Sequence, residues 1–199
     1  MYSEEKLKEA IETYNKIASV YAKYTEDKLI QFQLARFESM LPGKKILDVG
    51  CGSGRDTLYF HDDGFDSIGI DLAEKMVEEA KKRAPDSKFK KMDFRKMAFK
   101  DSSFGGVWSV NSLVHTPREQ IIPTLKEFHR VLSDKGIVYI SVKRGEGEKE
   151  EFDEKYDNKS RTFVYFEMKE MQDYLEQAGF KIISAECNDV WVEIFAEKI

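Results

Sequence analysis

The chain has 199 residues, of which 41% are hydrophobic and 35% charged, and its net charge is −5. This length fits one domain with a buried core, and the mixed charge argues against a nucleic-acid-binding surface, which needs a basic face. Cys51 and Cys187 are too far apart to suggest a disulfide framework or a zinc site, and no run of about 18 apolar residues predicts a membrane span. We therefore expect a single cytoplasmic domain over residues 1–199, with a monomer favoured and with no metal, nucleic acid or membrane as partner.

The first part of the chain has a helical pattern. Apolar side chains recur every three to four residues from Leu7 to Tyr21, after Ser3, which can cap a helix N-terminus. A second amphipathic stretch, residues 29–37, ends before Pro42. Residues 1–43 are therefore predicted to form a helical segment of their own.

From residue 45 onward, strand-like and helix-like segments alternate. Strands are predicted at residues 45–49, 67–70, 88–92, 107–110 and 137–142, and helices at 55–62, 73–83, 117–132 and 167–178. Alternation with short connections indicates βαβ units, whose right-handed crossovers place helices on both faces of a parallel sheet. The tail differs, because two strand-like runs at 181–186 and 190–196 predict an antiparallel hairpin that closes the sheet edge.

The segment ILDVGCGSGRD, residues 46–56, organises the rest of the chain. An apolar strand contains Asp48 near its carboxyl end, and Gly50, Gly52 and Gly54 follow before a helix begins. This arrangement brings backbone N–H groups close to a ligand at the end of a strand. The dinucleotide fingerprint G-x-G-x-x-G is not present, because Arg55 stands where the third glycine should be.

The pattern D-x-G-x-G-x-G instead resembles motif I of the class I S-adenosylmethionine-dependent methyltransferases. The resemblance implies an α/β fold: a Rossmann-like doubly wound sheet of seven strands, mostly parallel with an antiparallel C-terminal strand. Residues 1–43 would be an N-terminal helical cap and residues 44–199 the core. It also implies that the glycine loop, Cys51 included, approaches the methionine part of the cofactor. The chain is most similar to a group of small, uncharacterised methyltransferases (methyltransferase domains 11 and 25).

Two further strand ends carry acidic residues. Asp71 ends the second strand, and the resemblance assigns its carboxylate to the ribose hydroxyls, with Leu72 beside it. Met76, in the next helix, could contact adenine, but a methionine at such a position more often belongs to the core. At the third strand, Asp93 and Phe94 match the position that binds adenine in the family, but an aspartate after a strand is also ordinary turn chemistry.

The tyrosines of residues 14–24 match the cap that many small methyltransferases fold over the cofactor. We expect one or more of Tyr14, Tyr21 and Tyr24 at the site, with Tyr14 and Tyr24 as cofactor-binding residues. The alternative stays open, because aromatic residues at helical spacing often belong to the core.

The fourth strand departs from the family pattern. Gly105 replaces the usual aspartate, and Asn111 to His115 follow the strand instead of the proline-rich tetrapeptide of DNA and protein N-methyltransferases. Asn111 is expected beside the cofactor. Three roles remain open for His115: a general base with an ordinary pKa of about 6.5, a group that positions a substrate oxygen, or a helix cap.

The insert at residues 144–166 lies between the fifth strand and the last helix, over the expected site. Its acidic first part is typical of a solvated loop, and residues 161–166 alternate like a short strand. We predict that Arg161 and Tyr165 converge with His115, and that Lys143 joins them facing an anionic or polar acceptor. An exposed edge strand with incidental charges is the alternative.

Together these features predict methyl transfer from S-adenosylmethionine to a small-molecule acceptor, with S-adenosylhomocysteine as product. The alternatives are a protein that binds either nucleoside without transferring a methyl group, and an NAD-dependent oxidoreductase, which the missing third glycine disfavours.

Overall fold

The computed structural model describes residues 2–156 and 158–199, so Asp157 of the predicted insert lies outside the described residues. The helices are α1 (Glu4–Tyr24), α2 (Gln31–Met40), α3 (Arg55–Asp62), α4 (Glu74–Arg83), α5 (Arg118–Val131) and α6 (Met168–Gln177). The strands are β1 (Lys45–Val49), β2 (Asp66–Asp71), β3 (Lys88–Lys91), β4 (Phe104–Val110), β5 (Leu132–Lys143), β6 (Glu148–Asp153), β7 (Lys159–Val164), β8 (Phe180–Cys187) and β9 (Trp191–Lys198). Two short 3₁₀ helices are η1 (Leu113–His115) and η2 (Glu154–Tyr156).

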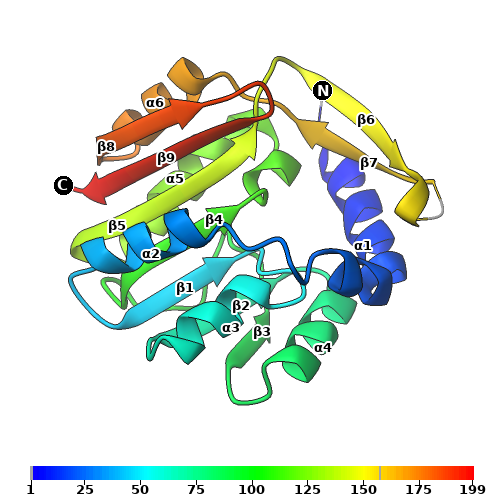
Figure 1. Cartoon of the computed structure of the whole chain (residues 1–199). Coiled ribbons are helices and arrows are strands. Elements are labelled where there is room, and N and C mark those ends of the chain that lie inside the picture. The colour runs from blue at the N-terminus through cyan, green and yellow to red at the C-terminus, as the bar shows by residue number, and fades with distance from the viewer. Residues whose placement is uncertain (1, 157) are drawn as a thin grey trace.

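Seven strands form one sheet in the order β3-β2-β1-β4-β5-β9-β8 (Figure 1). Strands β1 to β5 pair in parallel, and β9 runs antiparallel to both of its neighbours. This confirms the predicted Rossmann-like sheet. One detail differs, because the hairpin does not simply close the edge: β9 inserts between β5 and β8. The burial of Val192, Ile194 and Phe195 suits β9 to an inner position, whereas β8 at the edge exposes Ile183 and Glu186.

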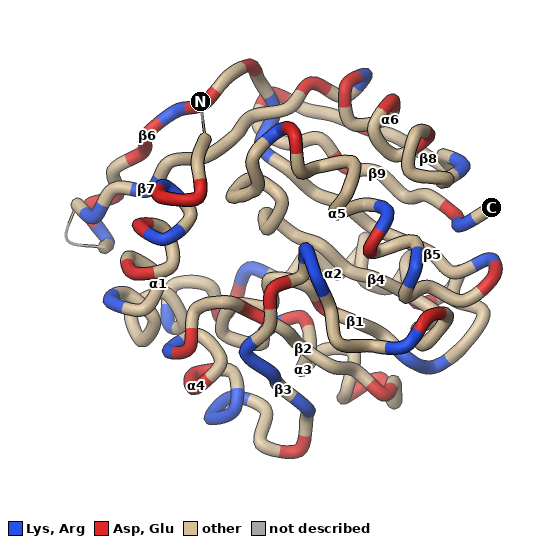
Figure 2. The backbone as a smooth tube through the Cα atoms, turned by 180° about the vertical axis from the view of Figure 1, so that it is seen from behind, with Lys and Arg blue, Asp and Glu red and all other residues tan. Residues whose placement is uncertain are grey.

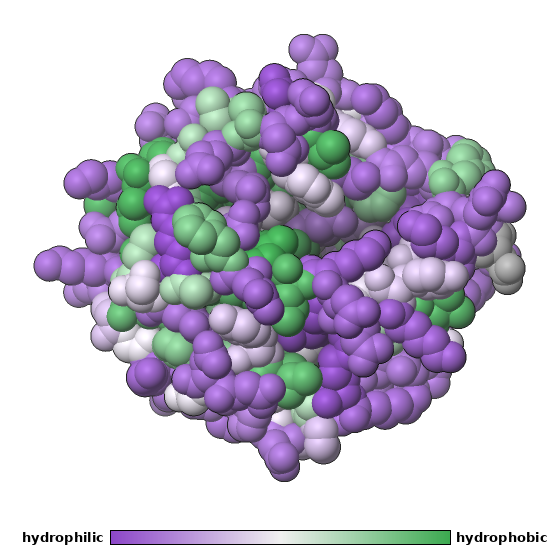
Figure 3. All heavy atoms as spheres, in the orientation of Figure 1, coloured by the Kyte–Doolittle hydropathy of each residue, from purple (hydrophilic) through white to green (hydrophobic). Residues whose placement is uncertain are grey.

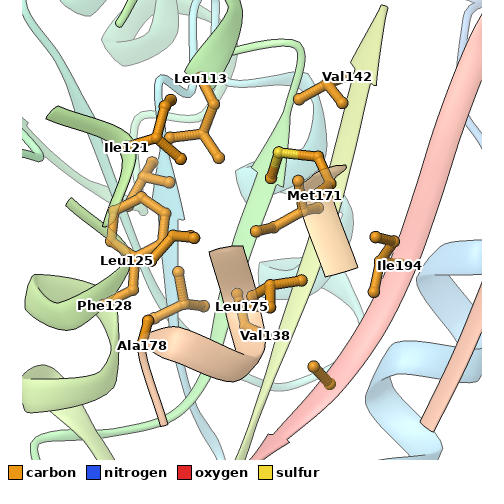
Figure 4. Packing of buried hydrophobic residues seen from close by; sticks show 14 of the residues in the cluster. Leu113, Ile121, Leu125, Phe128, Val138, Val142, Met171, Leu175, Ala178 and Ile194 are labelled. Carbon is orange, nitrogen blue, oxygen red and sulfur yellow. The ribbon is translucent and has the colours of Figure 1, made fainter. Parts of the chain in front are cut away.

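Helices cover both faces of the sheet. On one face, Phe37 of α2 and Phe60 of α3 pack against Trp108, whose ring stacks on Tyr139 of β5 at 4.2 Å. The other face is covered by α5 and α6, which bury an apolar cluster against β4, β5 and β9 (Figure 4). Burial on both faces explains why the central strands are continuously apolar rather than alternating.

The glycine that departs from the family pattern on β4 has a packing role. A Cβ atom on Gly105 would lie 3.0 Å from the carbonyl oxygen of Gly43. On the next residue, Gly106, it would lie 2.6 Å from side-chain atoms of both Leu41 and Phe37. The segment after α2 therefore sits directly on this strand, and an aspartate at position 105 would not fit without moving it.

The N-terminal helix and the insert lie next to each other beyond the carboxyl ends of the parallel strands. Helix α1 packs against α4 and β7, and β7 also contacts η1 (Figure 1). The predicted strand at residues 161–166 is present as β7. The acidic segment expected to be a solvated loop instead pairs with β7 as strand β6, from Glu148 to Asp153. Backbone pairing does not need apolar side chains, which is why composition alone did not reveal β6.

Charges of both signs are interspersed along the chain (Figure 2), and the face shown in Figure 3 is mostly hydrophilic with scattered apolar groups. Among the described residues, no helix combines the length and the apolar character that crossing a membrane requires.

Candidate functional site

The glycine loop is held in a conformation that only glycine adopts easily. Gly50, Gly52 and Gly54 have φ angles of 68°, 53° and 76°. The backbone N–H groups of Gly50 and Cys51 donate to the carbonyl oxygen of Ile70 at 2.8 and 3.0 Å, which ties the loop to β2. The third glycine has a different surrounding, because a Cβ atom on Gly54 would lie 2.9 Å from Ala80 and Phe89. Gly54 is thus needed for packing α3 against α4 and β3.

Asp71 anchors the same loop from the end of β2. Its Oδ2 accepts the N–H of Gly52 at 3.0 Å, and its Oδ1 accepts the N–H of Ala73 at 2.8 Å. Burial nonetheless raises the pKa of Asp71 to about 6, because the charged form loses hydration. A buried carboxylate with spare lone pairs is suited to accept further hydrogen bonds from a ligand hydroxyl.

Asp48 lies beneath the loop and is nearly inaccessible. Its Oδ2 accepts a hydrogen bond of 2.6 Å from the hydroxyl of Thr57. Burial, followed by repulsion from Asp56, raises the pKa of Asp48 to about 8. These surroundings favour the neutral form of the Asp48 carboxyl group.

Two adjoining cavities open at the carboxyl ends of β1, β2 and β4. The smaller has a volume of about 80 Å³ and the larger about 460 Å³. Both are lined by Tyr21, Gly50, Gly52, Val110 and Asn111.

Of the predicted site residues, several line only the smaller cavity: Tyr14, Asp71, Leu72, Met76, Phe94 and His115. Others line only the larger one: Asp48, Cys51 and Arg161.

Asn111 stands where the two cavities meet. It is a non-glycine residue in the left-handed region, with φ 54°, and its buried Oδ1 has no hydrogen-bond partner among the described residues. A strained backbone and an unpaired buried acceptor both cost free energy, and such features are concentrated at functional sites. The side chain is thus available to a ligand that reaches across both cavities.

Four predicted residues do not line either cavity: Gly54, Asp93, Tyr24 and Tyr165. Both oxygens of Asp93 bind Arg95, at 2.7 and 3.0 Å, so it is Arg95 and not Asp93 that reaches the cavity wall. Tyr24 is 48% exposed and meets only the edge of Tyr156.

Tyr165 reaches the larger cavity only through another residue. Its hydroxyl donates to Glu151, which lines that cavity and also accepts from Lys143 at 2.7 Å. The predicted convergence of Tyr165 with Arg161 is therefore only indirect: Tyr165 lies beyond the end of β7 and bonds to Glu151, the residue paired with Arg161 across the hairpin. The sequence carried no signal for Glu151, since β6 was read as a loop.

His115 is half-buried, and both of its ring nitrogens lie near tyrosine hydroxyls. The hydroxyl of Tyr2 lies 3.3 Å from Nδ1, and that of Tyr14 lies 3.0 Å from Nε2. Burial, and then the positive charge of Arg161, lower the pKa of His115 to about 3. The imidazole is neutral at physiological pH and is a weak proton acceptor. Tyr2 was not predicted, because one tyrosine before a helix has no recognisable pattern.

Arg161 projects from β7 into a ring of aromatic side chains. Its guanidinium carbon lies 4.8 Å from the ring centre of Tyr156, 5.3 Å from Phe163 and 5.5 Å from Tyr14. Phe163 also contacts His115, with ring centres 4.9 Å apart. Arg161 and His115, 46 residues apart in the chain, thus have Phe163 and Tyr14 as common neighbours. They line different cavities, so their predicted convergence in one pocket is met only in part.

The fold has close structural relatives of known class. A methyltransferase from Methanosarcina mazei superposes with a TM-score of 0.75 at 21% identity, covering 82% of this chain and 97% of that one. A [4+2]-cyclase superposes with a TM-score of 0.71 at 17% identity, covering 85% and 79%. Residues 46–136 match a family model described as a methyltransferase domain. This chain has a class I methyltransferase domain. The family and the fold together imply S-adenosylmethionine as cofactor.

Curated relatives of the methyltransferase domain match over part of their length. A 2-methyl-6-phytyl-1,4-hydroquinone methyltransferase from Synechocystis is 33% identical over 113 residues, which are 55% of this chain and 35% of that protein. The putative methyltransferase YqeM of Bacillus subtilis is 31% identical over 137 residues, 65% of this chain and 55% of that protein. The matched segments thus span roughly a third to a little over half of these relatives.

Proposed function

We propose that the protein transfers a methyl group from S-adenosylmethionine to a small-molecule acceptor. The observation that carries this proposal is the convergence of the glycine loop, Asp71 and Asn111 on two joined cavities at the carboxyl ends of the strands. Ligands of open α/β sheets bind at this edge.

The residues present fit the cofactor. Because Gly50 and Gly52 have no Cβ, their backbone stays accessible to a ligand. The carboxylate of Asp71 can accept hydrogen bonds from a ribose diol, and the unpaired Oδ1 of Asn111 can accept one more from the ligand. Phe94 supplies an apolar wall in the smaller cavity. We infer that the smaller cavity takes the nucleoside part and that the larger one takes the acceptor.

When bound, S-adenosylmethionine supplies an electrophilic methyl group on a sulfonium. The contribution of this chain is to orient the acceptor and to exclude water, which provides much of the rate in a simple displacement. His115 serves here as a positioning residue for Tyr14, which lines the smaller cavity, because its lowered pKa disfavours the general-base alternative.

The small-molecule acceptor is favoured over nucleic acid by the mixture of charges along the chain, which gives no basic face (Figure 2). The second candidate is a protein that binds the cofactor without transferring its methyl group. The shared fold of a [4+2]-cyclase supports it, since that fold also hosts other chemistry.

Two measurements test the proposal. Calorimetric titration with S-adenosylmethionine, S-adenosylhomocysteine and NAD should show binding of the first two only. Incubation with methyl-labelled S-adenosylmethionine and a fractionated metabolite pool should then label a small molecule, detected by mass spectrometry. Binding without any labelled product would favour the second candidate, and tight NAD binding would contradict both.

A further inference from the structure

Arg161 carries a buried positive charge on β7. It is 91% buried, given a relative exposure of 9%, and it forms no ion pair with any carboxylate of the described residues. Its Nε has no hydrogen-bond partner there either. Burying an arginine in this way is costly unless an anion completes it.

Apart from Lys28, which is exposed, the other cations around the larger cavity have carboxylate partners. Lys143 binds Glu151 at 2.7 and 2.9 Å, and Arg55 binds Asp56 at 2.7 Å. Lys155 at the rim lies 3.8 Å from Asp153.

The remaining carboxylates of that wall also have donors. Glu193 accepts from the hydroxyl of Tyr139, and Asp48 accepts from Thr57. Among the described residues of the cavity wall, Arg161 is thus the buried cation that forms no ion pair.

The aromatic surroundings favour a planar or compact oxyanion. Tyr14, Tyr156 and Phe163 hold the guanidinium in place and remove water from it, so a charged hydrogen bond formed there is strengthened. A guanidinium presents its donors as a fork that matches the geometry of carboxylate and phosphate groups.

We propose that Arg161 binds an oxyanion of the methyl acceptor, a carboxylate or a phosphate, and that the acceptor is therefore an anionic small molecule. This inference rests on the proposed function and names the chemical class of its acceptor. The carboxylate of the cofactor is the other possible source of an oxyanion.

The surroundings of Arg161 favour the acceptor side. Arg161 lines only the larger cavity and its charge acts on Glu151 of the same wall, whereas the charge of Arg55, at the glycine loop, acts on Asp48. Arg55 also opens helix α3, whose N-terminal N–H groups suit a carboxylate at the loop. The methionine end of the cofactor thus has an anion site of its own.

The test uses benzoate and phenyl phosphate as probes, with benzamide as the uncharged match for benzoate. Each is titrated by calorimetry into the full chain saturated with S-adenosylhomocysteine. Wild-type protein should bind at least one of the two anions and bind benzamide much more weakly. Which anion binds better decides between carboxylate and phosphate.

The variants are Arg161→Gln, Arg161→Lys and, as a control, Lys149→Met. Lys149 is an exposed cation on the same hairpin and does not line either cavity. Arg161→Gln should weaken anion binding at least about tenfold, the scale of a hydrogen bond to a charged group, while S-adenosylhomocysteine affinity stays. Arg161→Lys keeps the positive charge but loses the paired donors of the guanidinium, so its anion affinity should lie between those of wild type and Arg161→Gln. It serves as the test if Arg161→Gln does not fold. Lys149→Met should match wild type.

The outcomes separate the two proposals. A wild type that binds S-adenosylhomocysteine but neither anion overturns this inference and leaves the proposed function standing. Equal anion affinity in wild type and both Arg161 variants also overturns it. Loss of S-adenosylhomocysteine affinity in folded Arg161→Gln would assign the arginine to the cofactor instead. A wild type that binds no S-adenosylhomocysteine contradicts the proposed function itself.

Discussion

Replacing Gly50 by alanine is expected to destabilise the protein by more than the backbone strain alone. With φ 68°, an added Cβ costs about 1–2 kcal/mol from left-handed strain. It would also lie 2.4 Å from the Cβ of Ser112, an overlap whose relief costs typically about 1–3 kcal/mol in a packed region. The sum is about 2–5 kcal/mol, or a fall in Tm of very roughly 4–20 °C for a domain of this size.

Gly64→Ala is the matched control, because Gly64 has φ 81° and no atom within 4 Å of the added Cβ. It should show the strain alone. Adding Ser112→Gly to Gly50→Ala removes the overlapping atom and should recover the steric part of the loss. The assay is thermal unfolding with urea titration for free energies. If Gly50→Ala unfolds no earlier than Gly64→Ala, the close approach of the loop to Ser112 is wrong.

Three further changes test the site. Gly52→Val should abolish S-adenosylhomocysteine binding in calorimetry and also lower stability, because a β-branched residue is strained at φ 53° even though its Cβ would meet Tyr21 at an ordinary 3.5 Å; a folded variant with wild-type affinity would refute the loop assignment. Asp71→Asn should lower both stability and cofactor affinity, each by about 1.5–3 kcal/mol, since an amide nitrogen cannot accept the N–H that the carboxylate holds; unchanged values in both would contradict its role. For His115, the folded pKa of about 3 lies below the unfolded value of about 6.5, so this residue makes the protein less stable as pH falls from 6.5 towards 3. His115→Gln should therefore flatten the decline of the urea midpoint between pH 7.5 and 5. If the curves of wild type and variant are parallel, His115 is not held in its neutral form by the folded protein.

The fold was predictable because its signals are local. The glycine loop, the apolar runs and the short connections each constrain one βα unit, and the right-handed crossover then leaves few topologies. The order of the last two strands was not fixed in this way, since either strand of a hairpin can pair with β5. Burial of Ile194 and Phe195 decides it, and burial depends on the helices of both faces.

The site was predictable where a residue ends a strand of the sheet. Asp71 and Asn111 are placed by the strand ends, so their positions follow from the fold. Asp93 also follows a strand, but its carboxylate is taken by Arg95, a choice between neighbouring side chains that no pattern encodes. Glu151 and Tyr2 reach the site through long-range packing of the hairpin and of the residue before α1, and sequence spacing holds no record of such contacts.

The β6–β7 hairpin makes the proposed acceptor wall a separable piece of chain. It leaves the main sheet after β5 and returns at the bridge between Arg144 and Phe166, so the cofactor floor shares no strand with it. Evolution or an engineer can thus alter the acceptor by exchanging one continuous segment. Tyr14 restricts which hairpins can be exchanged, because from α1 it contacts both Arg161 and His115. A new hairpin therefore has to arrive with a compatible first helix, and the two segments should vary together among sequences that share this architecture.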